Sequence, residues 1–139
     1  MRRSYSAMLL ALGLAACSTP SDGGGGSAAN HVTLQGTVAY RERIALIPDA
    51  VVTVQIRDVS LQDAPSVTIA STEFKSEGRQ VPIPFSLKYD PAKIEPRRTY
   101  SVFARIDDAA GRMLWITDTH NPLPPPGQSI ALNLVSANR

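Results

Sequence analysis

Hydrophobic and polar residues alternate along most of the chain after residue 31, with the period of two that is typical of β-strands. The clearest stretch is 82–89, where every second residue is a large apolar one. No window has the spacing of a convincing amphipathic helix, apart from a single turn near 91–94. The pattern predicts seven short strands, at 32–40, 52–57, 67–74, 82–89, 100–106, 113–117 and 130–134.

Seven short strands separated by turn-forming residues favour an all-β fold. Each predicted strand has one apolar face, which is what a core between two sheets requires. We therefore expect an antiparallel β-sandwich of immunoglobulin-like (fibronectin III-like) type, spanning residues 32–136.

Segment 94–102 resembles the tyrosine corner of fibronectin type III domains, in which an apolar residue is followed by Pro96 and then by Tyr100 at fixed spacing. In that motif the tyrosine hydroxyl hydrogen-bonds to the backbone a few residues upstream and pins the crossover between the sheets. We expect Tyr100 to do the same here. The alternative is a core tyrosine at the start of a strand.

Pro82 and Pro84 lie two residues apart, so the N–H groups that they lack would fall on the same lateral side of a strand. That side cannot be paired within a sheet, so we expect an edge strand there. An edge strand is also a place where a partner segment can bind. Trp115 is a further candidate for partner binding, because exposed tryptophans often anchor interfaces. The alternative is that Trp115 belongs to the core.

Residues 1–16 have the layout of a secretory signal peptide, with two arginines near the start and an apolar segment at 7–16. This segment is too short to span a bilayer, which takes about 20 residues. We expect the leader to be removed and the mature chain to begin at Cys17. Residues 17–31 are rich in glycine and serine and lack large apolar side chains, so we expect a flexible linker.

The sequence Leu-Ala-Ala-Cys at 14–17 resembles the lipobox of bacterial lipoproteins. This resemblance implies that the Cys17 thiol carries fatty acyl chains, and two or three such chains would hold the protein on a membrane. The residue that follows this cysteine is Ser18, not an aspartate. In lipoproteins of Gram-negative bacteria that pattern implies sorting to the outer membrane. Because Cys17 is the only cysteine, no disulfide can form within the chain.

The net charge of the chain and the catalytic motifs that it lacks argue against two classes of function. Loss of the two leader arginines would leave basic and acidic side chains in balance, which argues against nucleic-acid binding. The chain has none of the common catalytic motifs, and its two histidines, His31 and His120, are far apart in sequence. We therefore expect no enzyme activity, no cofactor and no metal site.

Short stretches across 32–120 carry a wider resemblance, among them GTVAYRERIAL at 36–46, GRQVPIPF at 78–85, YDPAKI at 89–94 and YSVFARI at 100–106. In these stretches the chain resembles the YbaY/YscW family of small bacterial lipoproteins. The resemblance implies a lipid-anchored periplasmic β-sandwich. One branch of the family consists of pilotins, which escort the secretin of a type III secretion system and help it to assemble.

The sequence is compatible with three functions. The leading hypothesis is a non-enzymatic adaptor, anchored through Cys17 on the outer membrane and facing the periplasm, that binds an envelope protein such as a secretin. Its candidate contact residues are Trp115, Pro82 and Pro84. The second hypothesis is a small-ligand or lipid-binding module with an apolar cavity between the sheets. The third is a structural envelope lipoprotein without a dedicated ligand.

Overall fold

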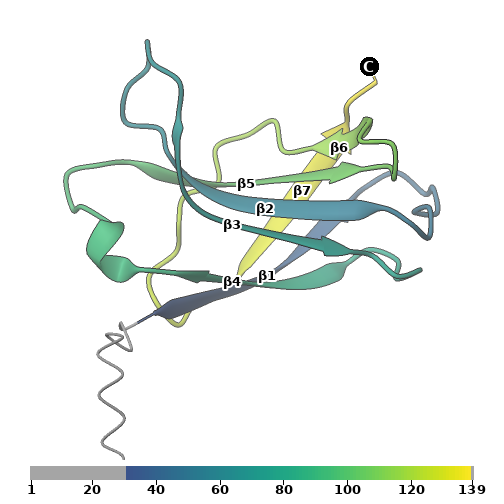
Figure 1. The fold of residues 1–139 in the computed structure, drawn as a ribbon, viewed down its shortest axis with the longest axis horizontal. Helices are drawn as coiled ribbons and strands as arrows, with labels where there is room; N and C mark the ends of the chain where they lie inside the picture. Colours follow the sequence, from purple (N-terminus) through teal and green to yellow (C-terminus); the bar gives the residue numbers. More distant parts are fainter. Residues whose placement is uncertain (1–30, 139) are drawn as a thin grey trace, which may run out of the picture.

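The computed structural model describes residues 31–138, which form seven strands and one short 3₁₀ helix, η1 (Figure 1). No helix among these residues is long and apolar enough to cross a membrane. The elements, in chain order, are β1 (Val32–Tyr40), β2 (Val51–Asp58), β3 (Val67–Lys75), β4 (Ile83–Tyr89), η1 (Pro91–Lys93), β5 (Tyr100–Asp107), β6 (Met113–Ile116) and β7 (Ile130–Ser136).

The strands hydrogen-bond in one continuous order, β3-β2-β5-β6-β7-β1-β4. Strand β7 joins the two halves, because it pairs antiparallel with β6 on one side and parallel with β1 on the other. The two end strands, β3 and β4, come back into contact without forming a hydrogen-bonded ladder. The result is a strongly curved, nearly closed sheet.

The all-β prediction is confirmed, but two details differ from the expected antiparallel sandwich of immunoglobulin-like type. The β1–β7 pair is parallel, and the sheet is continuous through β7 rather than divided into two separately paired sheets. Both differences come from strands at opposite ends of the domain sequence. The alternation of apolar and polar residues shows which face of a strand is buried. It does not show which strand, distant in the sequence, will pair with it.

The core lies inside the curve of the sheet. Along β4 the side chains alternate strictly, with Ile83, Phe85, Leu87 and Tyr89 buried and the residues between them exposed. The inner faces of the central strands β2 and β5 are buried in the same way. Each large apolar side chain buried here contributes about 1.5–3 kcal/mol to folding.

Strand β4 is an edge strand, as the prolines predicted. It pairs with β1 alone and ends the strand order. Pro84 lies within β4 and Pro82 directly precedes it. A proline at an edge lacks the N–H that a further strand would need, so this edge is protected against unwanted pairing.

The start of β1, helix η1 and the loop that leads into β7 gather at one end of the domain (Figure 1). At this end Val32, the first residue of β1, pairs with Tyr89, the last residue of β4. The chain therefore enters the domain beside the end of β4. The end of β7 lies at the opposite end of the domain (Figure 1).

Candidate functional site

The candidate site is a surface groove at the end of the domain where β1 begins. It encloses about 390 Å³ between helix η1 and the segment 123–126. Apart from two tyrosine hydroxyls, the side chains along it are apolar, and we call it the proline-tyrosine groove. It is lined by Tyr89, Pro91, Ile94, Tyr100, Leu123, Pro124, Pro125 and Pro126.

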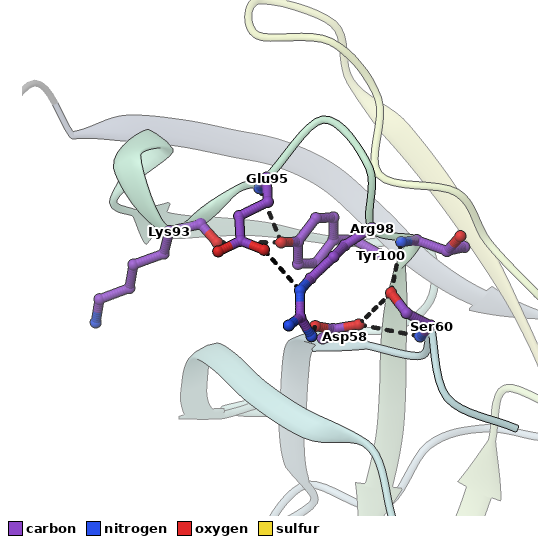
Figure 2. A network of polar contacts seen from close by, with 7 residues as sticks. Asp58, Ser60, Lys93, Glu95, Arg98 and Tyr100 are labelled. Carbon is purple, nitrogen blue, oxygen red and sulfur yellow. Dashed lines mark hydrogen bonds and ion pairs between the residues drawn. The ribbon is translucent and has the colours of Figure 1, made fainter. Parts of the chain in front are cut away.

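Tyr100 fixes one wall of the groove. Its ring is buried, and its hydroxyl accepts a hydrogen bond from the Glu95 N–H at 2.9 Å and donates one to the Lys93 carbonyl at 3.1 Å (Figure 2). These are the backbone contacts expected of a tyrosine corner. Pro96, which follows Glu95, is exposed in the same loop. The hydroxyl thus ties the loop after η1 to the start of β5.

A polar network holds the same loop from the other side (Figure 2). Asp58, at the end of β2, accepts hydrogen bonds from the Ser60 N–H at 3.0 Å and the Ser60 hydroxyl at 2.6 Å. Arg98 contacts Asp58 at 2.9 Å and Glu95 at 2.6 Å, and the Thr99 N–H donates to the Ser60 Oγ at 2.8 Å. The loop between η1 and β5 is therefore attached to β2 as well as to Tyr100.

This network shifts the ionisation of its members. The hydrogen bonds from Ser60, and then the contact with Arg98, hold the pKa of the Asp58 carboxyl below its ordinary value. The carboxylates of Asp58 and Glu95 raise the pKa of the Arg98 guanidinium. Sequence reasoning missed the network, although an aspartate two residues before a serine at a strand end is a signal for a local side-chain turn.

Tyr89 differs from Tyr100 in one respect. Its side chain is also buried, with 4% of the residue exposed, and it lines the groove. Its hydroxyl forms no hydrogen bond with any of residues 31–138. Burial raises the pKa of the Tyr89 phenol, so at neutral pH the hydroxyl keeps its proton and is an unused donor.

Trp115 is buried, so the prediction that it offers an exposed anchor for a partner is wrong. Only 7% of the residue is exposed, and its ring stacks on Tyr40 with the centroids 3.9 Å apart and the planes 3° apart. It lies opposite Ile106 in the β5–β6 ladder, on the inner face of the sheet. The flanking residues Leu114 and Ile116 are only partly buried.

The other predicted site residues lie apart from the groove. Pro84 pairs with Thr37, several residues along β4 from Tyr89, and Pro82 lies beyond it. Cys17 and the leader 1–16 fall outside the described residues. Within the described part of the chain, no group of three or more His, Cys, Asp or Glu residues is placed to hold a metal ion.

Comparison with known proteins identifies a family whose model matches most of this chain. The family model for the type III secretion system lipoprotein chaperone (YscW) matches residues 29–134. The lipoprotein YbaY of Escherichia coli (strain K12), described as uncharacterized, is 35% identical over 132 residues, which is 85% of this chain and 69% of that protein.

A solved structure is also similar. An alternative pilotin from the type II secretion system of Vibrio cholerae is 44% identical and superposes with a TM-score of 0.72. The match covers 78% of this chain and 99% of the pilotin chain. The proline-tyrosine groove lies inside the region that the family model matches.

Proposed function

Because the chain belongs to the YscW family of type III secretion system lipoprotein chaperones, we propose that it is a pilotin-like chaperone of an outer-membrane secretin. The resemblance to YbaY/YscW lipoproteins seen in the sequence is confirmed by this membership. The observation that carries the proposal is the match to the Vibrio cholerae pilotin. It covers 99% of that chain at 44% identity, so this chain contains the counterpart of nearly the whole pilotin chain.

The proposed mechanism combines anchoring with recognition. Acyl chains on Cys17 hold the protein on the inner surface of the outer membrane, because two or three buried chains bind a membrane far more firmly than one. A Gly/Ser-rich linker of the length of 17–31 has a typical reach of about 20 Å. The domain therefore samples the periplasm close to the membrane, and a secretin subunit bound to it is concentrated where it must assemble.

The domain supports recognition by shape and hydrogen bonding rather than by chemistry on a substrate. Tyr100 and the Asp58–Arg98 contact hold one wall of the groove, and the Leu123 N–H donates to the Tyr100 carbonyl on the other side, so little ordering is needed when a partner binds. Pro82 and Pro84 remain proposed contact residues because they lie at or just before β4, on a strand that has no hydrogen-bonded partner on its second side. Trp115 has no part in the proposal.

In-cell crosslinking tests the proposal. The full lipoprotein is crosslinked in living cells, purified under denaturing conditions, and the joined proteins are identified by mass spectrometry. A Cys17→Ser variant is the matched control, because it keeps the domain and removes the acylated thiol. We expect a secretin to be captured by the parent protein and to be depleted in the control. Recovery of no secretin with either protein would contradict the proposal.

A further inference from the structure

We propose that the proline-tyrosine groove binds an extended peptide segment of the partner, in polyproline II conformation, and that the Tyr89 hydroxyl donates a hydrogen bond to one of its backbone carbonyls. The proposal rests on the proposed function for the identity of the partner, but not for the chemistry of the groove. That chemistry follows from which hydrogen-bond donors around the groove are used and which are free.

Tyr89 carries the free donor of the groove lining. The four lining prolines have no N–H groups, and the backbone N–H groups of Ile94 and Leu123 are bonded to carbonyls within the domain. The Tyr100 hydroxyl already donates to the Lys93 carbonyl. The Tyr89 hydroxyl bonds to no residue within 31–138, and it still reaches the solvent although 96% of the residue is buried at the groove. The hydroxyl can therefore exchange its contact with solvent for a hydrogen bond to an acceptor that a ligand supplies.

This requirement separates an extended peptide from other apolar ligands. In polyproline II conformation the chain has no internal hydrogen bonds, so every backbone carbonyl is free to accept one. An α-helix uses its carbonyls internally except for the last four, and the hydrocarbon of an acyl chain has no acceptor at all. Proline-rich segments dock in grooves lined by aromatic side chains, which Tyr89 and Tyr100 supply here.

The linker of this chain is a poor occupant. Residues 18–30 contain no large apolar side chain to fill an apolar groove. The position of the groove is nevertheless informative, because Tyr89 pairs with Val32, the first residue of β1. A segment held there lies beside the point where the chain leaves the domain toward Cys17. The partner segment would therefore be held on the side of the domain nearest to the membrane anchor.

A peptide-binding assay on the full lipoprotein in phosphatidylethanolamine/phosphatidylglycerol nanodiscs tests this inference. The probe is a fluorescein-labelled peptide of sequence PPLPPLPP, and binding is followed by fluorescence anisotropy. We expect saturable binding that the Tyr89→Phe variant weakens about fivefold, which is the typical effect of losing one hydrogen bond. Leu123→Glu, which places a carboxylate in the apolar groove, should weaken it at least tenfold.

Tyr40→Phe is the matched control. It also removes one tyrosine hydroxyl, but that hydroxyl donates to the Ile44 carbonyl rather than facing the groove. We expect its peptide affinity to equal that of the parent protein. Circular dichroism of each variant establishes that the domain is folded before its affinity is interpreted.

Four results would overturn the inference. The first three are absence of saturable binding, equal affinity of Tyr89→Phe and the parent protein, and equal or tighter binding of a helical Ala/Leu/Lys peptide of the same length. The fourth is displacement of the peptide by added phospholipid vesicles, which would identify the groove as a lipid site. If any of these occurs while the parent protein still captures a secretin in cells, the groove proposal fails and the proposed function stands.

Discussion

Replacing Tyr100 by phenylalanine should destabilise the domain through two hydrogen bonds at once. The hydroxyl accepts from the Glu95 N–H and donates to the Lys93 carbonyl, and the ring that carries it is buried. A hydrogen bond within a protein contributes about 0.5–1.5 kcal/mol net, so the loss of both should cost about 1–3 kcal/mol. For a domain of roughly 100 residues, each kcal/mol lowers the melting temperature by about 4–8 °C.

Tyr89→Phe is a control of the same chemistry in the same groove. It also removes the hydroxyl of a buried tyrosine, but this hydroxyl reaches the solvent and bonds to no residue within 31–138, so we expect almost no change in the free energy of unfolding. Urea unfolding followed by fluorescence measures both variants, because Trp115 is the only tryptophan and is buried against Tyr40. If the two variants unfold at the same urea concentration, the tyrosine-corner reasoning is refuted.

Three further predictions concern other parts of the domain. Gly36→Ala should cost about 1–3 kcal/mol, because an added Cβ would collide with the Ile130 carbonyl across the β1–β7 pair; an unchanged urea midpoint would contradict this. Gln80→Ala removes the two side-chain hydrogen bonds that hold the Leu46 N–H and carbonyl, at 2.8 and 3.1 Å, so the Leu46 amide should exchange with solvent faster, and unchanged protection would count against the contact. The pKa of Asp58 is lowered in the folded state, so its stabilising contribution is complete above the unfolded value of about 3.9 and is lost as the pH falls through the folded value. Parent protein and Asp58→Asn should therefore differ in urea midpoint at pH 7 and converge as the pH falls through the lowered pKa of Asp58, whereas a constant difference would refute the assignment.

Local patterns in the sequence were sufficient for the strands and for the tyrosine corner. The alternation along β4 identifies its buried face directly, because successive side chains point to opposite sides of the sheet. The contacts of Tyr100 involve residues within seven positions of it, so a short motif is enough to anticipate them. The two prolines likewise identify an edge strand without any knowledge of its partner.

The sequence was insufficient where the outcome depends on distant segments. Leu114, Trp115 and Ile116 are apolar in succession, so no alternation shows which of them faces inward. The groove joins the end of β4 and helix η1 to the segment 123–126. The proline-rich run at 122–126 is visible in the sequence as an extended connection, but it meets the other parts only after the strands have paired.

The most direct test of the central claim is the assembly state of the secretin in cells. Outer membranes are isolated from the parent strain, from a strain lacking this lipoprotein, and from that strain carrying Cys17→Ser, and secretin multimers are measured by gel electrophoresis without heating. We expect heat-resistant multimers in the outer membrane of the parent strain and their loss in the other two strains. Unchanged secretin multimers in the strain without the lipoprotein would contradict it.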